Sequence, residues 1–506
     1  MHASLRPRLA RFRSLLAISF CVGLSALRSA PSIQTVFYDM PAGLLPAAMP
    51  APTAQLAAVS GYPDDPARLT FIARLYLPDP ALHGAGPHPV VVFLHGSGGL
   101  WSNDTIPASI GTSTTSTGLA SQFTQWGDLL AGLGYAALFP DSYNPRGIPA
   151  DFEGRRPHHD AAQDDTLCSP NYERPKDLVA ALEYLVSRAD IDRERVALIA
   201  FSQGAQTGMN ALLDTSVDRG VYDVDYVDLV DDPLNPGQQI EKTVKKTVPS
   251  PVRVPAHLPI PKFCAFYYGG GSHYGYHGQA SSVAAGRYML DRRTTAILFH
   301  GTGDSLLGIT NLTTTPLAGT FYPIKQVLAS AAQAATLGLP NPVVRHHLFD
   351  RTAVQTAGAR VGHSFDLGSV AIAPQADWDT AAESPNQKAR RLAREEVLRW
   401  LDFKLGPAPA LTLAPAPSAP ATHLEAAWPT RPRLAYRLER SETLAPDSWL
   451  DATAEAAGTG APSTFLSPRP APDARLFFRL RYQPVALPTT APEHAGFFKT
   501  YADFGL

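Results

Sequence analysis

A serine at the end of an apolar run is the first residue of this sequence that could do chemistry. Residues 196–202 read VALIAFS and are followed at once by QGAQTGMNALL. The apolar run predicts a buried strand and the next residues predict a helix, which places Ser202 at a sharp turn between them. Such a turn requires small residues two places on either side of the hydroxyl, and Ala200 and Gly204 meet this requirement. The pattern indicates a serine nucleophile; a serine that only caps the helix is the alternative.

A serine hydroxyl is a weak nucleophile, so it needs a base that a third group holds in place. After a strand–turn–helix serine, the acid and then the histidine follow along the chain. Asp304 ends the glycine loop HGTGD after an apolar run, and His363 lies in the polar loop VGHSFD before a long final helix. We therefore predict a triad of Ser202, Asp304 and His363, with Asp350 as the reserve acid. The alternative for Asp304 is a turn-forming aspartate beside a glycine.

Two segments predict backbone amides that could bind a negatively charged oxygen. The amide of Gln203 would lie at the start of the helix after the serine. The segment LHGSGG ends an earlier apolar run, and its turn would present the amide of Ser97 to the same oxygen, with the amide of Gly98 as the alternative donor. The alternative is a phosphate-binding glycine loop, but the Lys-Ser/Thr pair of such loops does not follow.

Other histidines indicate neither a second base nor a metal site. His346 and His347 fall inside a predicted strand, where a histidine is more often structural. His158 and His159 have no partner ligands at a spacing known for metals. The sequence therefore predicts no metal and no cofactor.

The elements that must position these residues follow a regular alternation. Apolar runs alternate with segments of helical periodicity, which predicts right-handed crossovers and a parallel sheet. The predicted strands lie within 68–78, 88–95, 135–141, 195–201, 262–268 and 294–300, and the predicted helices within 123–134, 176–189, 204–214 and 388–406.

Six segments of this region resemble the α/β-hydrolase superfamily and, within it, the dienelactone hydrolase-like branch. They are VVVFLHGSGGLW, GYAALFPDSYNPRG, RPKDLVAALEYL, DRERVALIAFSQGA, ILFHGTGD and GHSFD. The resemblance covers roughly residues 60–405 and implies an α/β fold, a mostly parallel sheet flanked by helices. It implies Ser202 as nucleophile, Asp304 as acid and His363 as base. The namesake dienelactone hydrolases have a cysteine where this chain has Ser202.

The two ends of the chain differ in composition from this middle part. Residues 1–30 join a basic segment to a short apolar one, which predicts an export signal, a secreted or periplasmic protein and no stable membrane anchor. Residues 31–406 form the predicted catalytic domain, with an insertion at about 215–262 to which we assign no structure. A Pro/Ala-rich linker at 407–422 precedes residues 423–506, a small β-sandwich-like module and tail.

Charge and cysteine content limit the partners. The net charge of −2, with 17% charged residues, gives no basic excess for binding nucleic acid. Beyond the signal, Cys168 and Cys264 remain; they could form one disulfide after export or stay two buried thiols.

Together these features predict a secreted serine hydrolase, in the first instance a carboxylic-ester hydrolase that forms an acyl-enzyme. Its partner would be a small-molecule ester, which could be attached to a polysaccharide. A serine peptidase of the same fold is one alternative. A non-catalytic binding or adhesion protein on a hydrolase scaffold is another. The sequence leaves the acyl group, the alcohol and the oligomeric state open.

Overall fold

The structure is a computed structural model of the 506-residue chain. It describes residues 31–148, 168–212, 221–267, 290–301, 343–349, 361–366, 385–470, 475–485 and 498–499, apart from 47, 64, 171–172, 232, 236–237, 250–251, 292 and 362–364. The predicted signal, residues 1–30, lies outside the described residues.

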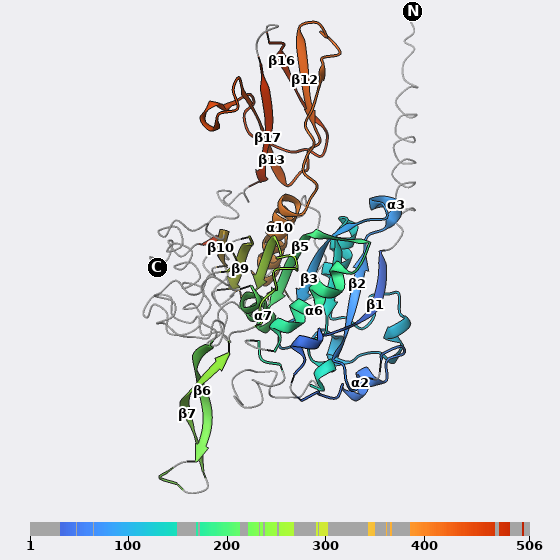
Figure 1. The fold of residues 1–506 in the computed structure, drawn as a ribbon, viewed down its shortest axis with the longest axis vertical. Helices are drawn as coiled ribbons and strands as arrows, with labels where there is room; N and C mark the ends of the chain where they lie inside the picture. Colours follow the sequence, from blue (N-terminus) through green and yellow to red (C-terminus); the bar gives the residue numbers. More distant parts are fainter. Residues whose placement is uncertain are drawn as a thin grey trace, which may run out of the picture.

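The core of the fold is one nine-stranded sheet (Figure 1). Its strands are β1 Ser32–Asp39, β2 Thr70–Leu77, β3 His88–Leu94, β4 Ala136–Pro140, β5 Ile191–Phe201, β8 Phe263–Tyr267, β9 Thr295–Gly301, β10 Val343–Phe349 and β18 Phe498–Lys499. They follow the spatial order β1-β2-β4-β3-β5-β8-β9-β10-β18. The pairs from β4 to β10 are parallel, whereas β1, β2 and β18 run antiparallel to their neighbours. The carboxyl ends of the central strands therefore meet at one edge of the sheet.

Helices cover both faces of this sheet. They are α4 Ser121–Gly132, α6 Pro175–Val186, α7 Gln203–Ala211 and α10 Pro385–Lys404. Residues Val90, Val92 and Leu94 of β3 pack in one buried cluster with α6 and α7. Their neighbours Val91 and Phe93 pack in a second cluster with α4 and α10. Because both faces are buried, the central strands contain continuous apolar runs, such as residues 196–201 of β5, and these runs are what the sequence analysis recognised.

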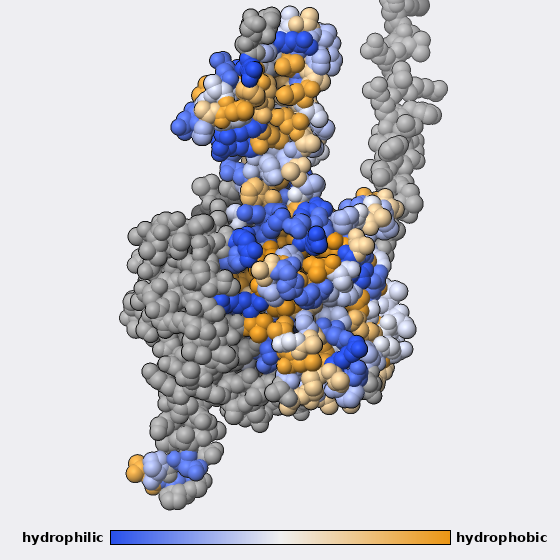
Figure 2. All heavy atoms as spheres, in the orientation of Figure 1, coloured by the Kyte–Doolittle hydropathy of each residue, from blue (hydrophilic) through white to orange (hydrophobic). Residues whose placement is uncertain are grey.

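Short elements complete this part of the chain. They are α2 Ala54–Ala57, α3 Pro80–His83, and the 3-10 turns η1 Ala42–Leu44, η2 Ser102–Asp104, η3 Ala108–Thr112 and η4 Asn144–Arg146. Within the described residues, no helix has the length and apolar character needed to cross a membrane. Hydrophilic and apolar residues are mixed over the face of the molecule in Figure 2.

The insertion contains a β-hairpin that the sequence analysis did not assign. Strands β6 Val221–Asp231 and β7 Gln239–Pro249 pair antiparallel along their whole length. They form a separate two-stranded sheet that projects from the body of the fold (Figure 1). The hairpin follows α7 along the chain, so it is inserted between the helix after Ser202 and strand β8.

The C-terminal module consists of two small antiparallel sheets. The first sheet contains β11 Thr412–Pro415, β12 His423–Trp428 and β16 Ser463–Pro468. The second contains β13 Leu434–Ser441, β14 Leu450–Asp451, β15 Ala456–Ala457 and β17 Phe477–Pro484. The 3-10 turn η9 Pro446–Ser448 connects β13 to β14. Trp428, Leu434, Tyr436 and Leu438 are buried between the sheets. Strand β11 lies inside residues 407–422, which the sequence analysis predicted to be a linker. Its four residues pair with β12, so this part of the range belongs to the sheet of the module.

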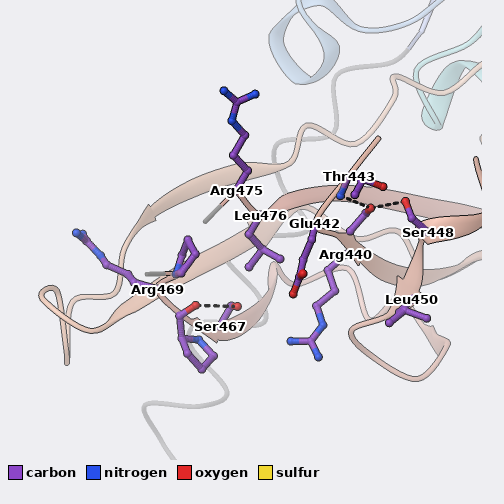
Figure 3. Close-up of a pocket in the computed structure, with 12 residues that line it drawn as sticks. Arg440, Glu442, Thr443, Ser448, Leu450, Ser467, Arg469, Arg475 and Leu476 are labelled. Atoms are coloured by element: carbon purple, nitrogen blue, oxygen red, sulfur yellow. Dashed lines mark hydrogen bonds between the residues drawn. The ribbon is translucent and has the colours of Figure 1, made fainter. Parts of the chain in front are cut away.

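The module contacts the end of α10. Arg431 donates 2.7 Å to the carbonyl oxygen of Asp402, and the rings of Phe403 and Tyr482 lie 5.7 Å apart. The module has a cleft of about 620 Å³. Arg440 and Arg475 are among the residues that line it (Figure 3).

Cys168 and Cys264 form no disulfide, so that alternative is wrong. Cys264 lies in β8 with its thiol 3.3 Å from the hydroxyl of Thr294, and burial raises the pKa of this thiol to about 12. Cys168 packs with Tyr143 and Ile148 in a different buried cluster. The two thiols belong to different parts of the core, and each is stabilised there as a small apolar side chain.

Candidate active site

Ser202 lies at the turn between β5 and α7, as the sequence predicted. Its backbone has φ 50° and ψ −120°, in the positive-φ region that non-glycine residues rarely adopt. The Ser202 amide donates 2.9 Å to the carbonyl oxygen of Tyr267 at the end of β8, which fixes this backbone against the sheet. A strained serine at the carboxyl end of a parallel strand is the geometry of a nucleophile elbow.

Small residues around Ser202 allow the turn to pack tightly. A Cβ atom placed on Gly204 would lie 2.3 Å from the carbonyl oxygen of Leu94 and 2.5 Å from that of His95. A Cβ atom on Gly96 would lie 3.1 Å from the Cβ atom of Ser202. The start of α7 and the loop after β3 are therefore in direct backbone contact, which explains why the sequence has glycine at both positions.

These two contacting segments carry the predicted amide donors. The amide of Gln203 begins α7, and Ser97 lies in the turn after β3 that the hydrogen bond from the Gly99 amide to the Gly96 carbonyl closes at 3.2 Å. The binding of an oxyanion by the amides of Gln203 and Ser97 stays a prediction.

The loop after β3 is held by the buried imidazole of His95. Nε2 of His95 lies 3.0 Å from the amide of Ser142 and must accept its hydrogen. Nδ1 therefore carries the proton and donates 2.7 Å to the carbonyl oxygen of Gly96. This neutral tautomer fixes the peptide that precedes Ser97 and thus the direction of the Ser97 amide.

Arg174 connects the same two segments through its guanidinium, and sequence reasoning did not identify it. This side chain is fully buried and donates 2.8 Å to Oε1 of Gln203 and 2.7 Å to the carbonyl oxygen of His95. The hydroxyl of Tyr143 also donates to Oε1 of Gln203. In the sequence, Arg174 precedes the apolar stripe of α6 without any periodic signal of its own, so only its place in the resemblance could have marked it.

The aromatic residues near the elbow are packed rather than open to a substrate. Trp101, Tyr143 and Tyr267 are all buried, at 3%, 0% and 0% exposure. Nε1 of Trp101 donates 2.6 Å to Asp141, which also receives the side-chain amide of Asn144 at 2.6 Å. These contacts hold the loop after β4 against the loop that follows β3.

Asp304 and His363, and the reserve Asp350, lie outside the described residues. Their described neighbours nevertheless meet beside the elbow. A Cβ atom on Gly301, at the end of β9, would lie 2.2 Å from the carbonyl oxygen of Val361. The ring of Phe365 lies 5.8 Å from the ring of Tyr267, whose carbonyl receives the Ser202 amide.

Asp366 anchors the segment that follows His363, and sequence reasoning missed this role. Its carboxylate receives Nε of Arg394 at 2.8 Å, Nε1 of Trp126 at 3.0 Å and Nε2 of Gln122 at 3.1 Å. Asp366 and Arg394 are both fully buried. The carboxylate thus ties this segment to α4 and α10, and its place three residues after His363 was the available signal.

No family model matches the chain, and no curated protein matches it. Several solved structures are similar. One is a dienelactone hydrolase-like promiscuous phosphotriesterase from metagenomic libraries, at 13% identity and a TM-score of 0.37, covering 74% of this chain and all of the other.

Two further similar structures are an esterase and a peptidase. The esterase of Thermogutta terrifontis, with propionate bound, is 12% identical with a TM-score of 0.32, over 67% of this chain and 92% of the other. The acylaminoacyl peptidase of Pyrococcus horikoshii is 13% identical with a TM-score of 0.35, over 79% of this chain and 45% of the other. By the order of its strands and the turn that carries Ser202, this chain has the α/β-hydrolase fold.

Proposed function

We propose that this protein is a serine hydrolase that cleaves carboxylic esters through an acyl-enzyme on Ser202. The observation that carries the proposal is the backbone of Ser202, held at φ 50° where β5 meets α7. Strain of this kind persists only where surrounding contacts impose it, and it gathers at functional sites. A serine that merely caps a helix has ordinary extended backbone angles and does not need this strain.

The proposed reaction uses the predicted triad and the predicted amide donors. Ser202 Oγ attacks the ester carbonyl carbon while its proton passes to His363, and the carbonyl oxygen becomes an oxyanion facing the amides of Gln203 and Ser97. The bond from the carbonyl carbon to the alcohol oxygen then breaks, and His363 returns the proton to the leaving alcohol. Water, deprotonated by His363, then attacks the acyl carbon. The bond to Ser202 Oγ breaks, His363 returns the proton to Oγ, and the carboxylic acid is released. Asp304 orients the imidazole and stabilises its charged form.

The flanking contacts support His363 and Asp304 in these roles. Gly301 precedes Asp304 by three residues, Val361 precedes His363 by two, and the two described residues are in contact. Phe365 packs against Tyr267 beside the elbow. The described residues that precede Asp304 and His363 therefore lie next to each other, which supports the predicted pairing of the two side chains.

A comparison of matched substrates tests the reaction class. We expect the purified protein to hydrolyse p-nitrophenyl acetate and other aryl esters faster than it hydrolyses aminoacyl p-nitroanilides. Ser202→Ala should lower kcat by about 10⁴-fold or more, and His363→Gln nearly as much, because a triad acts as a unit. Ser187→Ala, at an exposed helix end, is the matched serine control and should leave kcat unchanged.

Two outcomes would contradict the proposal. Full ester hydrolysis by Ser202→Ala would exclude Ser202 as nucleophile. Folded wild-type protein that hydrolyses neither substrate class would favour the binding-protein alternative, and a preference for the anilides would favour the peptidase.

Export is part of the proposal and rests on the composition of residues 1–30. Expression of the whole chain in a bacterial host followed by fractionation tests it. We expect the mature protein outside the cytoplasm and shortened at its N-terminus; full-length protein confined to the cytoplasm would contradict it.

A further inference from the structure

Arg174 is a buried cation with neutral hydrogen-bond partners. It is fully buried, its two donors reach the side-chain oxygen of Gln203 and the carbonyl oxygen of His95, and its guanidinium lies 5.2 Å from the ring centre of Tyr143. No carboxylate in the described part of the chain is within ion-pair distance of it.

Other buried arginines near the same edge of the sheet are paired with acids. Arg146 lies 2.5 Å from Asp177, and Arg394 lies 2.8 Å from Asp366. Burying a charge without a counter-charge is costly, so the place of each such charge in the fold is informative. Arg174, without a paired acid, lies next to the turn that carries Ser202, because it bonds the side chain of Gln203.

The two acceptors of Arg174 belong to the two segments that carry the predicted amide donors. One acceptor is the side chain of Gln203 itself, and the other is the carbonyl of His95, two residues before Ser97. The planar guanidinium holds its donors in a fixed arrangement, so it sets the separation of the two segments.

We propose that Arg174 is a positioning residue of the oxyanion site, because it bridges the two segments that carry the amides of Gln203 and Ser97 and adds positive charge beside them. The inference rests on the proposed function, since an oxyanion forms only if Ser202 is the nucleophile. Its positive charge opposes the negative charge of the tetrahedral intermediate, and neutral Gln203 does not cancel it. In a water-poor site this attraction is stronger than it would be at the surface.

Two substitutions separate position from charge. Arg174→Met removes both, and we expect kcat on an aryl ester to fall about 30-fold with KM within about threefold, because the loss is specific to the transition state. Gln203→Glu keeps an acceptor for Arg174 and the backbone amide but cancels the charge. We expect it to lower kcat about tenfold without lowering the thermal midpoint.

Phenylboronic acid supplies a readout that a purely structural role would not move. It forms a negatively charged tetrahedral adduct with a nucleophilic serine, so its inhibition constant reports on the oxyanion site. We expect this constant to rise in both variants by a factor similar to the loss of kcat.

Arg74→Met is the matched control. Arg74 is also fully buried and donates to the carbonyl oxygen of Ser113, but it lies on β2, two strands away from β3 and three from β5. We expect Arg74→Met to lower the thermal midpoint while kcat and the phenylboronate constant per folded molecule stay at the wild-type values.

The outcomes distinguish this inference from the proposed function. If Ser202→Ala is inactive while Arg174→Met and Gln203→Glu keep wild-type kcat and phenylboronate constants, the role of Arg174 is refuted and the function stands. If Arg174→Met and Arg74→Met lose kcat equally, Arg174 is only structural and the inference also fails. If Ser202→Ala keeps wild-type activity, the function itself fails.

Discussion

At the nucleophile corner of the sheet edge, formed by His95, Ser202, Gln203 and Arg174, the buried guanidinium of Arg174 bonds neutral acceptors. At the Asp366 corner, formed by Phe365, Asp366 and Arg394, the buried guanidinium of Arg394 is paired with a carboxylate. Both corners fix a loop at the carboxyl ends of the strands, and both do so with a fully buried arginine.

The difference shows how one type of side chain can serve two purposes. The paired charge of Arg394 is neutralised, so it anchors the segment after His363 without a strong local field. The charge of Arg174 is not neutralised by an acid, so it leaves positive potential where the reaction would develop negative charge. Stability should therefore depend more on the Asp366 corner, and rate more on the nucleophile corner.

The largest expected loss of stability comes from breaking the Asp366 corner. Arg394→Met leaves the Asp366 carboxylate buried without its counter-charge, which should cost about 3–5 kcal/mol in the free energy of unfolding. Arg174→Met strands no carboxylate and should cost less. Urea denaturation of the two variants measures the difference.

Arg68→Met is the surface control for this measurement. Arg68 pairs with Asp39 at 2.8 Å, but the two side chains are 60% and 38% exposed, so the variant should unfold at nearly the wild-type urea concentration. A smaller loss of stability in Arg394→Met than in Arg174→Met would contradict the comparison. Adding Asp366→Asn to Arg394→Met should restore part of the stability, because the stranded charge is gone.

Adding a methyl group to Gly204, at the nucleophile corner, should lower stability less than Arg394→Met does but should lower kcat strongly. Gly204→Ala would place Cβ 2.3 Å from the carbonyl oxygen of Leu94, so the start of α7 must shift. We expect about 1–3 kcal/mol of destabilisation. The displaced Gln203 amide and Ser202 hydroxyl should lower kcat about 10²-fold. Ester hydrolysis and urea denaturation on the same preparation measure both.

Gly132→Ala provides the matched glycine control. Gly132 ends α4, and a Cβ atom there meets nothing within 4 Å. This variant should keep wild-type kcat and be slightly more stable, since alanine favours a helix. If Gly204→Ala were equally active, the close packing of the elbow would have no bearing on the reaction.

Much of the main sheet and of the elbow could be predicted from the sequence, because buried parallel strands are continuous apolar runs. Strands β3, β5, β8 and β9 all fall where such runs were recognised. Strand β1, Ser32–Asp39, was missed because it lies at the sheet edge and mixes polar with apolar residues. The placement of Asp304 and His363 relative to Ser202 stays a prediction.

Other features depend on contacts between distant parts of the chain, so no local pattern reveals them. The hairpin of β6 and β7 has charged residues in both strands, and its pairing is not visible from periodicity. Arg174 and Gln203 are 29 residues apart, and Asp366 meets Trp126 across 240 residues. The contacts that join the residues of each corner are consequently visible only in the folded structure.

The central claim is that Ser202 is the nucleophile, and covalent labelling tests it most directly. We would treat the folded protein with a fluorophosphonate probe, digest it and locate the adduct by mass spectrometry. The account predicts one stoichiometric adduct on the peptide containing Ser202, absent when the protein is first unfolded. Labelling at another residue, or no labelling of folded protein that hydrolyses esters, would contradict it.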